Sequence, residues 1–324
     1  MGSAVENEAP TVHIVVTCTN RKRVRVPSHL QVRDLQKSDV ARRSRAWIKR
    51  LSDAPTVALA KELYAGEHWQ IARGLAERVG AHGRLWVSSA GYGLISADAP
   101  LAPYGATFAL GQDDSVADDL VGVRAWWEGL AQWEGPEPGQ PRSISALAAR
   151  EPDSVIIAVL SDPYVRACAL DLRDAEKQLS DADSLSVVGP AGRCHEVDDM
   201  VVPVTAALRS AVGGSLLSLN VRAAADVIDA CQRVGDPLKR PFLKKLMQSA
   251  HEAAPVIEAR PAGARLTDDQ VRDFIFKHVA FGPTSATKLL RALRDAGLSC
   301  EQSRFRQLFL DVTASRSAGS GGLF

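Results

Sequence analysis

The chain has 324 residues, of which 46% are hydrophobic and 24% charged, and its formal net charge is +1. This composition predicts a globular protein with a sizeable core and excludes a mainly disordered or collagen-like chain. No stretch approaches 18 consecutive apolar residues, and residues 1–10 lack the basic-then-apolar order of a signal peptide, so we expect a cytoplasmic protein that does not span a membrane.

The first predicted strand, 12–18, leads directly into a strongly basic segment. Between Asn20 and Arg50 there are 11 basic and two acidic residues, a net charge of +9 that leaves −8 for the rest of the chain. This asymmetry favours a local anionic partner, DNA or RNA, over a merely solvated basic helix. Asn20 could read a base edge or hold a water. We expect the phosphates to be bound by Arg21, Lys22, Arg23 and Arg25.

A second predicted strand, 85–88, follows helical patterns over 57–64 and 69–79 and ends in a glycine-containing turn. Glycines in such a turn let backbone amides approach a ligand closely. Tyrosines gather beside this turn and two other loops, and aromatic faces stack on unpaired or flipped bases. Core packing or a simple structural turn is the alternative. The predicted base pocket consists of Tyr64, Ser89, Gly91, Tyr92 and Tyr104.

The second half of the chain begins with the clearest strand, 154–160, which an amphipathic helix, 165–179, and a further strand, 185–188, follow. Strands that alternate with helices predict an α/β fold, a mostly parallel sheet flanked by helices, over residues 1–254. Ligands of such sheets lie outside the carboxyl ends of the strands. Asp162 follows the clearest strand, where it could support cleavage of an N-glycosidic bond or cap the helix. Asp98 and Glu67 compete for the same catalytic role.

Residues 255–264 read as a linker to a small C-terminal domain, 265–316. Three short helices, the first with a capping box at Thr267, are typical of a helix-turn-helix unit or of a plain helical oligomerisation module. In the first case we expect phosphate contacts from Lys288, Arg291, Arg304 and Arg306. Five scattered cysteines without a CxxC pair indicate reduced thiols, and the seven histidines show no metal spacing, so we predict no metal and no cofactor.

Four segments taken together resemble a known family. They are VVTCTNRK, ALAKELYAGEHW, LWVSSAGYGLI and LAPYGATF, and their order and spacing are similar to those of the bacterial YaaA-type family over residues 12–110. The residues that carry the resemblance include Cys18, Lys22, Tyr64, Tyr92 and Tyr104. The resemblance implies nucleic-acid binding and a base pocket. The overall plan is also similar to that of anti-phage DNA glycosylases that remove glucosylated hydroxymethylcytosine.

These observations predict a DNA glycosylase that flips a modified base, as in phage DNA, into a pocket at the strand ends and hydrolyses its glycosidic bond in antiviral defence. Two alternatives stay open at this point. One is a DNA-binding protein without catalytic activity, and the other is an enzyme that exchanges bases in tRNA.

Overall fold

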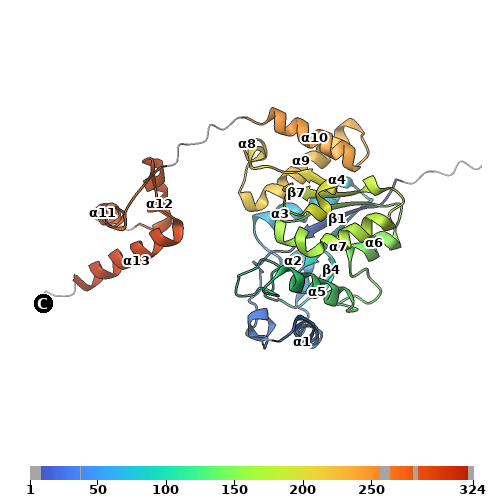
Figure 1. The fold of residues 1–324 in the computed structure, drawn as a ribbon, viewed down its shortest axis with the longest axis horizontal. Coiled ribbons are helices and arrows are strands. Elements are labelled where there is room, and N and C mark those ends of the chain that lie inside the picture. Colours follow the sequence, from blue (N-terminus) through green and yellow to red (C-terminus); the bar gives the residue numbers. More distant parts are fainter. Residues whose placement is uncertain (1–8, 37, 256–262, 280–283, 320–324) are drawn as a thin grey trace, which may run out of the picture. The chain divides into compact units, whose positions relative to one another are not determined.

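The computed structural model describes residues 9–36, 38–255, 263–279 and 284–319, and the chain divides into two compact units, residues 1–256 and 257–324. The first unit holds a six-stranded sheet of order β4-β3-β1-β6-β7-β8 (Figure 1). Its strands are β1 (Val12–Thr17), β3 (Gly83–Ser89), β4 (Gly93–Ser96), β6 (Val155–Val159), β7 (Leu185–Gly189) and β8 (Val201–Pro203). All neighbours pair in parallel except β3 and β4, so the predicted mixed α/β fold with a mostly parallel sheet is confirmed.

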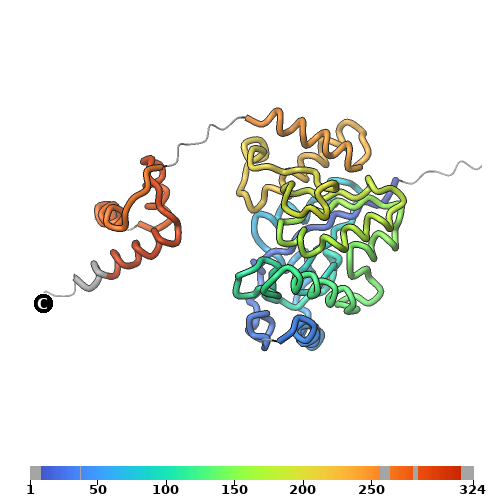
Figure 2. The backbone as a smooth tube through the Cα atoms, in the orientation of Figure 1, coloured from blue at the N-terminus to red at the C-terminus, as the bar shows by residue number. Residues whose placement is uncertain are grey.

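Helices cover both faces of this sheet, as Figures 1 and 2 show. The helices α4 (Leu75–Val79), α9 (Leu219–Val234) and α10 (Arg240–Ala253) contact the strands and one another on one face. On the other face lie α5 (Leu120–Ala131), α6 (Ile144–Arg150) and α7 (Asp162–Gln178), and α1 (Val40–Ser52) packs on α5. Five further elements are short. β2 (Ala58–Leu59) pairs with β5 (Pro100–Leu101), and the other three are α2 (Ala60–Leu63), α3 (Glu67–Ala72) and α8 (Arg209–Val212).

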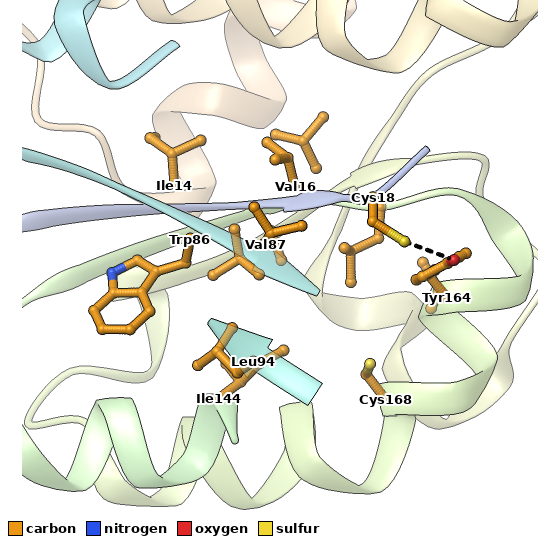
Figure 3. Close-up of a cluster of buried hydrophobic side chains, with 14 of the residues drawn as sticks. Ile14, Val16, Cys18, Trp86, Val87, Leu94, Ile144, Tyr164 and Cys168 are labelled. Carbon is orange, nitrogen blue, oxygen red and sulfur yellow. Dashed lines mark hydrogen bonds between the residues drawn. The ribbon is translucent and has the colours of Figure 1, made fainter. Parts of the chain in front are cut away.

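β1 lies in the middle of the sheet, between β3 and β6, and all six of its residues are buried because both faces of the sheet are covered. Figure 3 shows Ile14 and Val16 on one side of β1 and Leu94, Ile144 and Cys168 on the other, so apolar side chains pack against both faces of the sheet. The polar residues of β1 are Thr17, at the end of the strand, and His13, within it. Its Nδ1 accepts a hydrogen bond from the Trp86 indole at 3.0 Å, its Nε2 lies 3.2 Å from a carboxylate oxygen of Glu151, and burial lowers its pKa. The histidine therefore stays within the core as a hydrogen-bonded neutral ring.

Two tryptophan side chains close the turn between β3 and β4. The indole of Trp47 in α1 donates to the Gly91 carbonyl, and that of Trp126 in α5 donates to the Ala90 carbonyl, each at 2.9 Å. Both indoles are fully buried. Because buried carbonyls must find donors, these bonds fix the helices over the turn and remove it from solvent.

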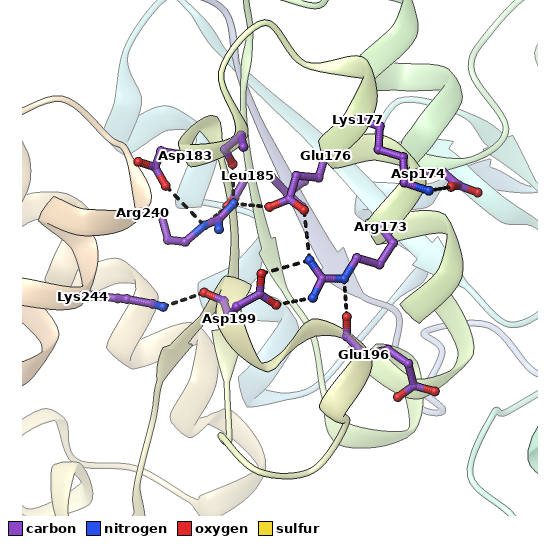
Figure 4. A network of polar contacts seen from close by, with 11 residues as sticks. Arg173, Asp174, Glu176, Lys177, Asp183, Leu185, Glu196, Asp199, Arg240 and Lys244 are labelled. Atoms are coloured by element: carbon purple, nitrogen blue, oxygen red, sulfur yellow. Dashed lines mark hydrogen bonds and ion pairs between the residues drawn. The ribbon is translucent and has the colours of Figure 1, made fainter.

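A network of ion pairs joins α7 to the β7–β8 edge of the sheet (Figure 4). Arg240 of α10 binds Glu176 of α7 at 2.7 Å and donates to the Leu185 carbonyl at 2.8 Å. Arg173 of α7 binds Asp199, which lies in the 3-10 helix η4 (His195–Met200). These charges serve packing between elements, and they lie apart from the cavity described below.

The second unit is built from three helices and a small parallel pair of strands. The helices are α11 (Asp268–Val279), α12 (Ala286–Asp295) and α13 (Gln302–Gly319), and the strands are β9 (Ala264–Arg265) and β10 (Leu298–Ser299). A separate apolar core holds them together, with Val271, Ile275, Leu293 and Phe305 fully buried. The predicted linker, 255–264, overlaps the boundary between the units, and residues 256–262 of it lie outside the described residues.

Among the described residues, no single helix has the length and apolar character needed to cross a membrane. One pair of segments, Ala206–Val212 and Leu216–Val234, meets the two criteria together but is bent by 90°.

Candidate functional site

The candidate site is a cavity at the carboxyl ends of β1 and β6. The chain leaves β1 for β3 on one side and returns as β6 on the other, so the strand order reverses between these two strands. This is the position at which open α/β sheets form a crevice for ligands. The cavity has a volume of about 780 Å³, roughly twice that of a neighbouring cavity of about 380 Å³. Its wall comes from residues 17–20, 65–68, 107, 109, 161–164, 190, 204, 206, 215–217, 219 and 220.

Three of the four predicted catalytic candidates, Asn20, Glu67 and Asp162, line this cavity. Asn20 is exposed, and its side chain makes no hydrogen bond within the described residues. Asp162 is the first residue of α7, and Ser161 takes the N-cap position, so the alternative of a capping aspartate does not hold. One Asp162 carboxylate oxygen lies 3.2 Å from Nε of Arg166. The amino ends of α7 and α9 both border the cavity.

Glu67 begins α3, and its carboxylate accepts a hydrogen bond from Arg222 at 2.8 Å. The Arg222 guanidinium, followed by the hydroxyl of Ser215, lowers the pKa of Glu67. The Glu67 carboxylate is therefore ionised at neutral pH, and its charge is paired with that of Arg222.

His68 is a cavity residue that the sequence interpretation missed. Its Nε2 lies 3.2 Å from the Thr17 carbonyl at the end of β1. Burial lowers its pKa, against smaller raising effects of hydrogen bonds to Thr17 and Leu217. The imidazole is therefore neutral at pH 7. Its sequence position could have indicated it, because it follows Glu67 and the tyrosine–glycine segment that carries the family resemblance.

The fourth candidate, Asp98, does not belong to this group. It follows β4 and is 67% exposed, and its carboxylate pairs with Lys61 at 2.6 Å. It does not line the cavity.

Of the predicted sites, the base pocket agrees least with the structure. Its five residues are buried in the core, and none of them lines the cavity. The Tyr104 hydroxyl lies 2.8 Å from that of Tyr64 and 2.6 Å from Oγ of Ser89, so the three form a hydrogen-bonded chain. The Tyr92 hydroxyl donates to the Ala102 carbonyl at 3.2 Å. Burial raises the pKa of all three tyrosines.

Gly91 is needed for packing and not for the approach of a ligand. A Cβ atom at this position would lie 2.4 Å from Cδ2 and 2.5 Å from Cε2 of Tyr104. Its φ is not positive, so the requirement for glycine comes from the tyrosine ring that lies against it.

Lys22 joins this tyrosine cluster to the neighbouring cavity. Its ammonium lies 4.3 Å from the centre of the Tyr104 ring and 5.2 Å from that of Tyr64, and it donates to the Thr19 carbonyl at 2.5 Å. Burial lowers its pKa to about 8. Asn20 and Thr107 line both cavities, and Lys22 lines the smaller one.

The residues that carry the family resemblance thus meet at one place, although they are scattered over residues 12–110 in the sequence. Cys18 completes the group, with its Sγ 3.1 Å from the Tyr164 hydroxyl (Figure 3). Tyr164 also lines the cavity. The cluster forms a buried polar support beneath the end of β1, from which Asn20 reaches the cavity.

Of the predicted phosphate-binding residues, Lys22 is held against the buried tyrosines, and the others fall into two groups. Arg21, Arg23 and Arg25 are exposed and form no ion pair within the described residues. The same holds in the second unit for Lys288, Arg291 and Arg306. Arg304 differs, because its guanidinium pairs with Asp268 at 2.5 Å and donates to the Leu266 carbonyl.

In the part of the chain that the structure describes, no three His, Cys, Asp or Glu side chains are grouped as metal ligands would be. Searches of protein-family models, of curated proteins and of solved structures find no match to this chain.

Proposed function

We propose that the protein is a DNA glycosylase that hydrolyses the N-glycosidic bond of a modified nucleotide extruded into the β1–β6 cavity. The observation that carries the proposal is the convergence of Asn20, Glu67 and Asp162, from three distant segments, on one cavity at the strand ends. Most glycoside hydrolases use two carboxylates to break a glycosidic bond, and two line this cavity.

The reaction breaks the bond between C1′ and the base nitrogen, and the electron pair leaves with the base. The positive charge that develops on C1′ and the ring oxygen is stabilised by nearby anions. Asp162 accepts a proton from the attacking water, whose oxygen bonds to C1′. Glu67 adds negative potential, and Asn20 binds the edge of the base. The departing base takes up a proton from solvent, Asp162 releases the proton that it accepted, and the products are a free base and an abasic deoxyribose.

The size of the cavity favours a base with a bulky substituent. Sites for small molecules occupy roughly 300–1,000 Å³, and this cavity of about 780 Å³ is in the upper part of that range. A nucleotide whose base carries a sugar, such as a glucosylated hydroxymethylcytosine of phage DNA, fits such a volume better than an unmodified nucleotide, which would leave much of it to water.

Exposed cations near the cavity and in the second unit supply the contacts to the phosphates. Arg21, Arg23 and Arg25 directly follow Asn20 in the chain and carry no competing carboxylate. On α12, Lys288, Arg291 and Arg294 are exposed at a spacing of three residues, while Leu289 and Leu293 are buried. Residues three apart share a face of a helix. We propose that this face docks on DNA as a helix-turn-helix module does.

The test is release of bases from unmodified DNA and from DNA with glucosylated hydroxymethylcytosine, followed by mass spectrometry under single-turnover conditions. Asp162→Asn should slow release by about 10²–10⁴-fold because it removes the proton acceptor. DNA affinity should stay within twofold of wild type. Glu67→Gln should slow release less, and Asp98→Asn is the matched control, since this aspartate lies outside the cavity.

Tight binding without release of any base would replace this proposal with a DNA-binding protein that has no catalytic activity. Exchange of a base in tRNA, with incorporation of a labelled free base and no abasic product, would replace it with a transglycosylase.

A further inference from the structure

The smaller cavity beside the candidate site contains an ammonium group without an acidic partner. The volume of this cavity is about 380 Å³, and Lys22 is one of its wall residues. The ammonium lies against the rings of Tyr64 and Tyr104 and donates to the Thr19 carbonyl. An ammonium has three N–H donors, and within the described residues Lys22 forms this one hydrogen bond and no ion pair. Because a charge that is withdrawn from water needs an opposite charge, Lys22 lacks a counter-ion.

The carboxylates of the same cavity are already bound to another cation. The two oxygens of Asp114 accept hydrogen bonds from the Arg33 guanidinium at 2.9 and 2.5 Å. Asp113 pairs with the same guanidinium at 3.3 Å and is 82% exposed, so water screens its charge. Asp114 therefore acts on Lys22 only from a distance and does not neutralise it.

Neutral hydrogen-bond donors line the same cavity. The side-chain amides of Asn20 and Gln112 belong to its wall and make no hydrogen bond within the described residues. The hydroxyl of Thr107 accepts a hydrogen bond from the Ala109 amide at 3.2 Å, and a hydroxyl can donate one bond as well. With the ammonium, these groups suit a ligand that is negatively charged and has several acceptor oxygens.

Backbone hydrogen bonds between distant segments hold the wall of this cavity in place. The Val32 amide donates to the Gly105 carbonyl, and the Gly105 amide donates to the Leu30 carbonyl, each at 2.8 Å. The Thr107 amide donates to the Asp114 carbonyl at 2.9 Å. The donors are therefore positioned before a ligand binds, which lowers the entropic cost of binding.

We propose that this cavity binds a phosphate group, whose charge is paired with that of Lys22 and whose oxygens accept hydrogen bonds from Asn20, Thr107 and Gln112. Lysine commonly binds phosphate as a point charge. The inference does not rest on the proposed function, because its evidence is the charge and the donors of the smaller cavity. Asn20 and Thr107 line both cavities, so a bound phosphate also orders the wall of the larger one. The phosphate belongs to a free phosphate compound or to the backbone of a nucleic acid, and the test separates these two sources.

The test measures trace acylation of single lysines by acetic anhydride, read by mass spectrometry on the wild-type protein at a pH equal to the Lys22 pKa of about 8. Inorganic phosphate should slow acylation of Lys22 about fivefold or more, because a nearby anion raises the pKa, and a rise of one unit lowers the share of free amine from a half to about a tenth. Potassium chloride of equal ionic strength should not slow it. Lys177 is the internal control, since it is exposed and lines neither cavity.

The same measurement with an unmodified single-stranded oligonucleotide identifies the source of the phosphate. Protection of Lys22 by inorganic phosphate assigns the site to free phosphate compounds, and protection by the oligonucleotide alone assigns it to a nucleic-acid backbone. Protection by neither would overturn the site, and so would equal slowing at Lys22 and Lys177.

A variant of the wall tests whether the protection comes from this cavity. Gln112→Ala removes one exposed donor and should raise the concentration that half-protects Lys22 at least about threefold, the effect of one hydrogen bond to a charged group. This comparison uses inorganic phosphate or, if only the oligonucleotide protects, the oligonucleotide. Gln132→Ala is the matched control, because Gln132 is also exposed and lies outside both cavities. Equal half-protection concentrations for the two variants would overturn the assignment of the phosphate to this cavity.

Discussion

Replacement of Gly91 by alanine is expected to destabilise the first unit without acting on a ligand. The added Cβ would lie 2.4 Å from Cδ2 of Tyr104, a distance that real Cβ contacts do not reach, so the buried ring has to move. The ring hydroxyl is held at 2.6 Å by Ser89 and at 2.8 Å by Tyr64, which leaves it little freedom. Overpacking of a core costs about 1–3 kcal/mol, and the loss of a buried hydrogen bond adds about 1 kcal/mol. We therefore expect the free energy of unfolding to fall by about 2–4 kcal/mol.

Urea denaturation of Gly91→Ala and wild type measures this difference. Gly74→Ala is the control, because the nearest atom to its Cβ would be 3.6 Å away and its φ of −93° suits alanine. It should change the free energy of unfolding by less than about 1 kcal/mol. Gly91→Ala with wild-type stability and no base release would refute the reasoning, since the glycine would then serve a ligand and not the tyrosine.

Three further outcomes are expected. Tyr104→Phe removes the hydroxyl at the centre of the buried hydrogen-bonded chain of side chains. In urea denaturation it should lower the free energy of unfolding by about 1–3 kcal/mol, while base release per folded molecule stays unchanged. Loss of base release at full stability would instead make this tyrosine catalytic. Lys22 has a pKa of about 8 in the folded state, below the value of about 10.4 for an unfolded chain. Between these two pH values the unfolded state binds more protons, so the free energy of unfolding should rise with pH across that window. The rise should be absent in Lys22→Met, and parallel pH curves for the two proteins would contradict it. The last prediction concerns three cations, Arg21, Arg23 and Arg25. When all three are replaced by alanine, the plot of log binding constant for DNA against log salt concentration should have a slope shallower by about 2–3. An unchanged slope would exclude them from the phosphate contacts.

The sheet could be predicted from the sequence because its central strands are continuous apolar runs. The predicted strand 154–160 appears as β6, and 185–188 appears within β7. The position of the cavity followed from the same reading, since residues after β1 and β6 had to lie at one edge of a parallel sheet. The helix predicted over 69–79 is instead two helices, α3 and α4, separated at Arg73 and Gly74.

The same reasoning failed at the end of β3, because the sequence of the turn there has the same pattern as a ligand-binding loop. This strand is followed by the antiparallel β4 and not by a crossover, so the turn folds back on the sheet. Trp47 and Trp126, from distant helices, then cover its carbonyls. No local pattern contains this information. For the same reason His68 was missed, since its place in the cavity wall depends on the approach of the Thr17 carbonyl and of the backbone at Leu217.

The intrinsic tryptophan fluorescence of the protein reports on the first unit and not on the second. All six tryptophans and all four tyrosines of the chain lie within residues 1–256, and the second unit contains only phenylalanine as an aromatic fluorophore. Intrinsic emission therefore follows the unfolding of the first unit alone, whereas far-ultraviolet circular dichroism follows helices in both units. Coincident transitions by the two probes would mean that the units unfold together, and separate transitions would give each unit its own stability. Quenching of the emission by DNA would likewise locate the contact on the unit that holds the cavity.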